Sequence, residues 1–167
     1  MISSFPTGII QKVKGIISKY NLKTVVKDST LRRNIAYTFQ FIDLVEWLLN
    51  DTDIGLTVKE QVIKYGIVAL DSIMESILRD YLEYNRVKPS KKTKRNINKL
   101  AKLDCPAKVV NSLSDLHKKR NKIHLHLWRN KLEYKKYKVK DFRKAKKDLF
   151  VFMKWISKEK WGNSPSG

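Results

Sequence analysis

Residues 66–74 read Gly-Ile-Val-Ala-Leu-Asp-Ser-Ile-Met and lie in the longest helical pattern of this 167-residue chain, about 58–85. Apolar residues recur there at spacings of three and four, in two neighbouring stripes. One stripe holds Val62, Gly66, Ala69, Ile73 and Ile77, and the other holds Leu70, Met74, Leu78 and Tyr81. An apolar arc this wide predicts a helix buried between neighbours, roughly 40 Å long at 1.5 Å per residue.

The same period extends to both sides of this stretch. It predicts further helices at about 7–20, 30–50, 94–103, 106–122 and 141–160. Capping candidates are Asp28, Ser29 or Thr30 for 30–50, Thr57 with Glu60 for 58–85 and Asp141 for 141–160. Pro106 suits the first turn of 106–122. Strand alternation and short hairpin turns are absent, so the expected fold is all-α, an antiparallel bundle of five to six helices.

The predicted core of the later helices follows from their stripes. Val109, Val110, Leu113, Leu116, Phe142, Ala145, Leu149, Phe152, Met153 and Ile156 are expected to face inward. We expect loops at 51–56 and 87–93, and a loop or frayed helix at 129–140. Residues 1–161 are expected to form a single domain, and 162–167 a disordered tail.

Composition narrows the possible environments. The single cysteine, Cys105, excludes an internal disulfide framework and favours a reducing compartment. The first residues lack the pattern of a signal peptide, and no apolar run approaches the roughly 20 residues of a membrane span. We therefore expect a cytoplasmic protein that does not enter a membrane.

The net charge of +20 is concentrated in one part of the chain. Residues 86–147 contain 23 Lys and Arg but only 4 Asp and Glu, whereas residues 1–85 contain 10 of each. A positive field of this size attracts polyanions, with nucleic acid first and anionic membranes second. A Lys-rich face can also serve only to keep a protein in solution.

All three histidines lie inside the basic segment, at 117, 124 and 126. Together with Cys105 they match no zinc-ligand spacing, and the acidic residues of the segment are too scattered for a carboxylate metal cluster. No Gly-rich phosphate loop or Gly-x-Ser-x-Gly elbow is present. We therefore expect neither a metal ion nor another cofactor.

Metal-free RNA cleavage needs only a few groups. The 2′-hydroxyl must lose a proton, the leaving 5′-oxygen must gain one, and the phosphorane needs a cation. Histidine can serve as acid or base near neutrality, and arginine offers a fixed fork of donors to phosphate oxygens. Arg120 together with His124 or His126 supplies this minimum.

Residues 120–126, Arg-Asn-Lys-Ile-His-Leu-His, resemble the Arg-x4–6-His motif of HEPN domains. The stretch 66–74 is similar to the long central helix of such bundles, so the general likeness covers about 57–160. The resemblance implies a helical homodimer in which two motifs meet, and a metal-independent RNA endonuclease of the toxin or antiviral-defence type. Other members of the family bind nucleotides or partners without catalysis.

Under this resemblance Arg120 would stabilise the phosphorane, Asn121 would position the RNA or the motif, and His126 would act as acid or base. His126 has the family spacing, but on a regular helix His124 would lie about 40° from Arg120 and His126 about 120° away. The choice between the two histidines stays open. His117 is expected to be exposed and structural, and Asn121 could instead end a helix.

The remaining basic and aromatic residues suggest contacts to the RNA backbone and bases. Candidate phosphate contacts are Lys118, Lys119, Lys122, Arg129, Lys135, Lys136, Lys138, Lys146 and Lys147. Trp128, Tyr134 and Tyr137 could stack on bases or belong to the core. The alternatives are a basic helical module that binds RNA or a protein without cutting, and a protein bound to anionic membranes. An acidic antitoxin or a nucleotidyltransferase is a conceivable partner.

Overall fold

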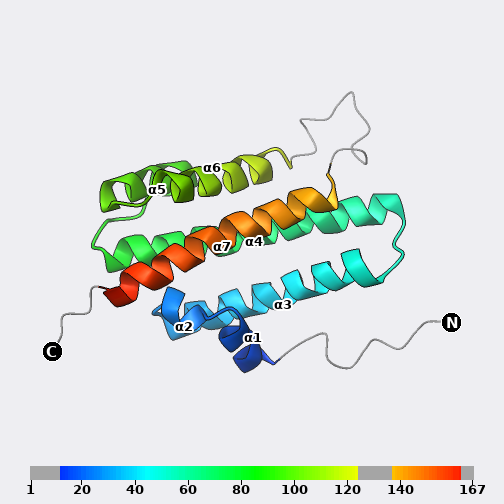
Figure 1. Ribbon diagram of the computed structural model, residues 1–167, viewed down its shortest axis with the longest axis horizontal. Coiled ribbons are helices and arrows are strands. Elements are labelled where there is room, and N and C mark those ends of the chain that lie inside the picture. The colour runs from blue at the N-terminus through cyan, green and yellow to red at the C-terminus, as the bar shows by residue number, and fades with distance from the viewer. Residues whose placement is uncertain (1–11, 124–136, 163–167) are drawn as a thin grey trace.

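In the computed structural model, the described residues are 12–123 and 137–162, and their regular elements are all helical (Figure 1). They are α1 (Val13–Lys19), α2 (Leu22–Val25), α3 (Ser29–Asp51), α4 (Leu56–Tyr84), α5 (Thr93–Leu100), the 3-10 turn η1 (Ala101–Leu103), α6 (Ala107–Asn121) and α7 (Val139–Gly162). The all-α prediction is confirmed. No described helix is long and apolar enough to cross a membrane.

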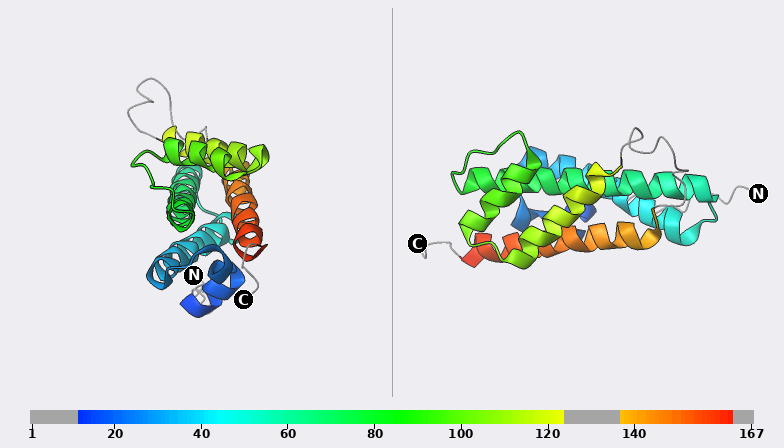
Figure 2. Two further views of the ribbon diagram at one scale, coloured as in Figure 1. Left: turned by 90° about the vertical axis from the view of Figure 1, so that its left-hand side faces the viewer. Right: turned by 90° about the horizontal axis from the view of Figure 1, so that it is seen from above.

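Successive long helices run in opposite directions, as the short connections predict (Figure 1). Seen end-on, α4 and α7 form a middle layer, with α5 and α6 on one side and α1–α3 on the other (Figure 2). The structure has one short helix more than the sequence predicts. Asn21 adopts a left-handed conformation (φ 50°, ψ 40°), which ends α1 and starts α2, and asparagine tolerates this region better than most residues.

Of the three predicted caps, Asp28 is in place, Asp141 lies inside the helix that it was predicted to start, and the third is wrong. Asp28 accepts a hydrogen bond from the Leu31 backbone N–H at 2.6 Å, as expected for the start of α3. Asp141 lies within the first turn of α7 and accepts the Lys138 backbone N–H at 2.9 Å. The Thr57–Glu60 capping box does not form. Helix α4 starts at Leu56, and Glu60 lies on the buried side of that helix, only 2 % exposed.

The core lies where α3, α4, α6 and α7 meet. Every predicted inward residue of α7 is buried, and in α6 only Val110 is partly exposed. Gly66 lies where α4 packs against side chains of both α7 and α3. A Cβ atom added there would lie 2.8 Å from Phe142 on α7 and 3.1 Å from Val45 on α3. Only glycine allows the middle of α4 to pack this closely against both neighbours.

Candidate functional site

A buried carboxylate in the middle of α4 connects that helix to the end of α6. Asp71 is only 3 % exposed. His117 Nδ1 is 3.3 Å from its Oδ1, and Arg120 Nε is 3.7 Å from its Oδ2. His117 and Arg120 are three residues apart and therefore share one face of α6. The structure thus groups the motif arginine with an aspartate and with the histidine that the sequence does not single out.

The position of His117 corrects the sequence prediction. It was expected to be exposed, but its side chain is 17 % exposed and lies against Asp71. The cause is the position of Asp71, because a buried carboxylate is stabilised when donors and cations gather around it. The spacing of residues within α6 does not reveal this contact, because Asp71 lies on α4.

Burial raises the pKa of Asp71 above its ordinary value of 3.8, because the low-dielectric interior disfavours the charged form. His117 and Arg120 oppose this rise, and nearby Glu75 adds to it. The Asp71 carboxylate therefore depends on these two α6 side chains for compensation of its charge.

The guanidinium of Arg120 is held at more than one point. In addition to its approach to Asp71, Nη1 donates a hydrogen bond to Asn121 Oδ1 at 3.0 Å. The side chain is nevertheless 40 % exposed, so solvent or a ligand can reach it. A planar guanidinium fixed in this way is suited to bind phosphate oxygens.

Helix α6 ends at Asn121, and Lys122 is its C-cap. The regular-helix geometry that would place His124 near Arg120 therefore does not extend to either motif histidine. His124 and His126 lie outside the described residues, as do Arg129, Lys135 and Lys136. The choice between the two histidines stays a prediction.

Tyr137, which lies just before α7, contacts the end of α6. Its hydroxyl donates to the Lys122 backbone carbonyl at 3.0 Å, and the residue is 8 % exposed. Of the two roles considered for Tyr137, base stacking and core packing, the structure favours the core. Trp128 and Tyr134 lie outside the described residues.

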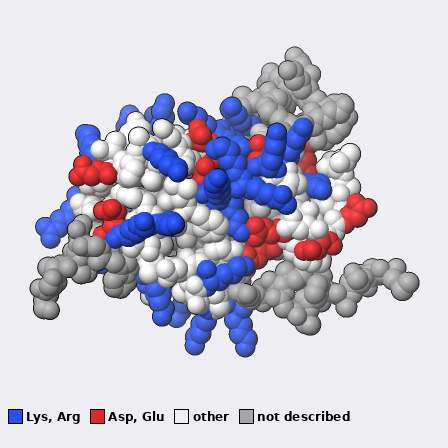
Figure 3. Space-filling view, viewed as in Figure 1, with Lys and Arg blue, Asp and Glu red and all other residues white. Residues whose placement is uncertain are grey.

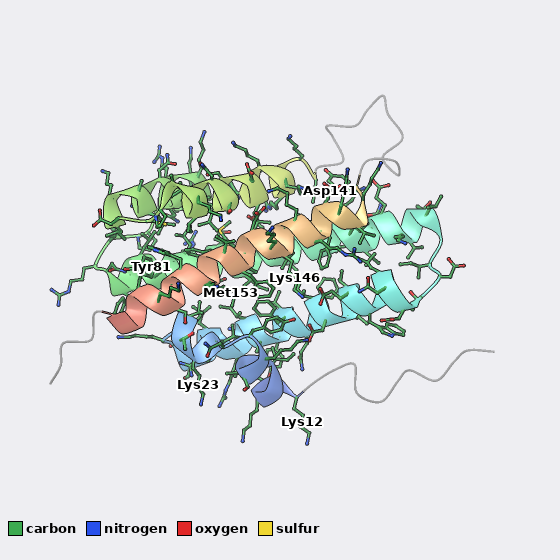
Figure 4. The ribbon with its side chains drawn as sticks, in the orientation of Figure 1. Lys12, Lys23, Tyr81, Asp141, Lys146 and Met153 are labelled. Atoms are coloured by element: carbon green, nitrogen blue, oxygen red, sulfur yellow. The ribbon has the colours of Figure 1, made fainter. Side chains whose placement is uncertain are left out.

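The predicted phosphate-binding lysines differ in how accessible they are. Lys118, Lys122, Lys138 and Lys147 are exposed. Lys119 instead pairs with Asp141 at 2.8 Å, and Lys146 pairs with Glu46 at 2.6 Å. Figure 4 labels Asp141 and Lys146 on α7. The side chains of Lys119 and Lys146 are only 23 % and 18 % exposed. These two lysines hold α7 to α6 and to α3, so they are poor candidates for phosphate contacts.

A second buried charged pair lies on the same side of α4 as Asp71. Glu60 and Lys64 are 2 % and 4 % exposed, and their charged groups are 3.7 Å apart. Glu60 also borders a cavity of about 570 Å³, which Leu56, Ile63 and Tyr137 help to line. The spacing of Glu60, Lys64, Asp71 and Glu75 repeats at helical intervals, and this signal in the sequence could have revealed the polar face.

The cysteine lies apart from the site. Cys105 precedes α6, whereas Arg120 is near its far end, about 20 Å away along a helix of this length. Burial raises the pKa of the Cys105 thiol to about 12, with a further contribution from Glu159. Within residues 12–123 and 137–162, no group of three or more His, Cys, Asp or Glu side chains could hold a metal ion.

No protein-family model, curated protein or solved structure matches this chain. The resemblance to HEPN domains stays a prediction from the sequence motif. The candidate site is defined by its own geometry: Arg120 at the end of α6 contacts Asp71 on α4 and donates a hydrogen bond to Asn121.

Proposed function

We propose that the chain is a metal-independent RNA endonuclease of the HEPN type, with Arg120 as the cation of its active site. The observation that carries the proposal is the anchoring of Arg120. A buried carboxylate faces Nε and an amide oxygen accepts from Nη1, yet the side chain is 40 % exposed. Preorganised donors stabilise developing charge at less cost than mobile ones, because they need not reorient during the reaction.

In the proposed reaction the 2′-oxygen attacks the adjacent phosphorus and the bond from phosphorus to the 5′-oxygen breaks. A base accepts the proton of the 2′-hydroxyl, and an acid donates a proton to the leaving 5′-oxygen. The products are a 2′,3′-cyclic phosphate and a 5′-hydroxyl. Arg120 stabilises the phosphorane, and His126, with His124 as the alternative, acts as acid or base.

We further propose that the active unit is a homodimer. Arg120 and Asn121 lie at the end of α6 and are half-exposed and exposed, so a second copy can approach them. A dimer would bring two arginine–histidine sets to one RNA strand and supply an acid and a base from different copies. Sedimentation at several protein concentrations tests this directly.

The decisive experiment is cleavage of a fluorophore-labelled RNA in EDTA. Wild type is compared with Arg120→Ala, Arg120→Lys, His124→Ala and His126→Ala, and with Lys108→Ala as an exposed control on the same helix. We expect Arg120→Ala and one of the histidine variants to lose at least a hundredfold in rate, and Lys108→Ala to stay within a few-fold. Cleavage at the wild-type rate by both Arg120→Ala and the double variant His124→Ala/His126→Ala would overturn the mechanism.

The second candidate is a module that binds RNA or a partner protein without cutting it. The contacts of His117 and Arg120 with Asp71 favour this reading, because the same contacts can serve simply to attach α6 to α4. RNA binding without cleavage, weakening steeply with salt as phosphate contacts do, identifies this alternative.

A further inference from the structure

The outward face of α7 bears a row of exposed cations. Its members are Lys140, Arg143, Lys144, Lys147, Lys154 and Lys158. They recur at about one helical turn, with one interruption at Val151, over roughly 27 Å of helix. Figure 3 looks onto this side, and Lys and Arg side chains gather there over the end of α6 and the first half of α7. We call these six residues the α7 basic row.

The acidic residues of α7 compensate only part of this charge. Asp141 is turned toward Lys119, and Asp148 is 8 % exposed and pairs with Lys144 at 2.8 Å. No ion pair within the described residues involves Lys154 or Lys158. Glu159, the remaining acidic residue of α7, is exposed next to Lys158 in the chain and offsets part of the charge of Lys154 and Lys158. The second half of the row therefore keeps a net positive charge that a ligand can reach.

Lys154 and Lys158 also form the rim of a groove between α7 and the pair α1–α2. The groove has a volume of about 690 Å³. Its apolar lining consists of Tyr20, Val25, Phe150 and Met153. The rings of Tyr20 and Phe150 are nearly parallel, with centroids 5.8 Å apart and an interplanar angle of 13°.

Polar groups line the same groove. Ser157 on α7 donates a hydrogen bond to the hydroxyl of Thr24 on α2 at 2.9 Å, and the exposed Asn21 lies beside them. Figure 4 labels Lys146 and Met153, which come from the side of α7 that borders this groove. Glu46 also lines the groove, where it pairs with Lys146, and Tyr20 is only 8 % exposed because it stacks on Phe39. The groove thus combines a mostly buried aromatic wall, hydrogen-bonding groups, one ion pair and a cationic rim.

We propose that this groove binds an unpaired base of single-stranded RNA while the flanking phosphates contact the α7 basic row. The proposal rests on the proposed function for the choice of RNA, and it adds the class of substrate. A base offers a flat apolar face and polar edges, and its backbone offers anions on both sides. These features match the lining, the hydroxyls and the rim of the groove.

The groove is what distinguishes single strands from duplexes. A row of lysines alone attracts any polyanion, including double-stranded RNA and anionic membranes. A base inside a duplex is stacked and paired, so it cannot enter a groove without first being unstacked. An unpaired base can enter directly. The structure therefore points to a preference for single strands in addition to general attraction by charge.

Binding is tested by fluorescence anisotropy with the full chain carrying Arg120→Ala, which separates binding from cleavage. The probes are a labelled 12-nucleotide single-stranded RNA, the same sequence as a duplex, and an abasic ribose-phosphate oligomer of equal length. We expect the single-stranded RNA to bind about tenfold more tightly than the abasic oligomer, because one base contributes stacking that the backbone lacks.

Two kinds of variant locate the contact. Ser157→Leu and, separately, Thr24→Leu fill the groove from opposite walls without changing the charge, and each should abolish the preference for bases. Lys154→Glu/Lys158→Glu should weaken all three probes at least tenfold and reduce the slope of log K against log[salt] by about 1.4 for single strands. Lys102→Glu/Lys108→Glu makes the same charge change on exposed lysines of η1 and α6, and should weaken binding less.

Several outcomes would overturn the proposal. One is equal affinity for single-stranded, duplex and abasic probes. Another is loss of affinity in the Lys102/Lys108 variant as large as in the Lys154/Lys158 variant, and a third is tighter binding to phosphatidylserine vesicles than to RNA. Base-dependent binding by a protein whose wild type does not cleave would refute the nuclease but keep the groove. If wild type, Ser157→Leu and Thr24→Leu all cleave RNA at the same rate and none prefers bases, the groove is refuted and the nuclease is kept.

Discussion

Arg120 Nε lies 3.7 Å from Oδ2 of Asp71, so the motif arginine at the end of α6 faces a carboxylate that is 3 % exposed in the centre of α4. The buried residue positions the exposed one. Asp71 is fixed by the packing of the longest helix, and it limits the positions that the half-exposed guanidinium can take. Residues that hold a functional group in this way affect activity more than stability.

The variant Asp71→Asn tests this relationship. We expect RNA cleavage to fall at least tenfold, because Arg120 loses its anionic partner and samples more orientations. The free energy of unfolding at pH 7 should change by less than about 2 kcal/mol, because the substitution also removes a buried charge and the remaining Arg120 is 40 % exposed. Urea unfolding gives the second quantity. A large loss of stability together with unchanged cleavage would assign Asp71 to the fold alone.

The pH dependence of stability should carry the signature of the same carboxylate. Its pKa is raised in the folded protein, so the folded state holds this proton more tightly than the unfolded state does. The contribution of Asp71 to stability therefore falls as the pH rises from its ordinary value of 3.8 through the folded-state pKa. Subtracting the urea-unfolding profile of Asp71→Asn from that of wild type isolates this decline. A difference that rises with pH would contradict it.

Gly66→Ala should lower the free energy of unfolding by about 1–3 kcal/mol, the usual cost of overpacking a core. The added methyl would lie 2.8 Å from the Phe142 ring. Phe142→Leu shortens that ring, so the double variant should be more stable than the sum of the two single effects predicts. Additive effects in this double-mutant cycle would mean that the methyl is accommodated elsewhere.

Tyr20→Phe should cost about 1.5–3 kcal/mol, the range for a hydrogen bond to a charged group. The Tyr20 hydroxyl donates to Asp43 on α3, which Lys19 Nζ also contacts at 2.9 Å. Burial and the Asp43 carboxylate raise the pKa of Tyr20, so the hydroxyl remains a donor at neutral pH. Tyr37→Phe is the matched control, because Tyr37 lies on α3 and is 57 % exposed. Equal thermal stability of the two variants would refute the prediction.

The Cys105 thiol should react slowly with a disulfide reagent at pH 8 in the native protein and rapidly after denaturation. Its pKa is raised to about 12 and the residue is 7 % exposed, so little thiolate is present or accessible. The change in absorbance on release of thionitrobenzoate measures the rate. Comparable rates in the native and denatured protein would show that the start of α6 opens easily.

The helical architecture could be predicted from apolar spacing because each long helix buries apolar residues that recur at three and four positions. Phe142, Leu149 and Phe152 illustrate this, since their spacing alone places them in the core. Asp28 could be predicted for a similar local reason, because its capping bond needs only the next three residues. Such features depend on neighbours in sequence.

Apolar periodicity does not predict the charged side of α4, because it gives no weight to charges. The helical spacing of Glu60, Lys64 and Asp71 indicates a shared face, but their partners lie on other helices or other turns and follow only from the structure. The failed Thr57–Glu60 cap has the same origin, since the interior competes with the helix start for the Glu60 carboxylate. The pairing of Lys119 with Asp141 and of Lys146 with Glu46 likewise depends on tertiary packing.

The hydrogen bond from Tyr137 to the Lys122 carbonyl has a consequence for how such a protein can evolve. This bond directly connects the two chain positions that flank residues 124–136. Closing a segment between points that are already adjacent adds only about 0.6 kcal/mol for each doubling of its length. The length and sequence of this segment, which contains both motif histidines, can therefore change at little cost in stability. Such changes would leave α3, α4, α6 and α7 as they are.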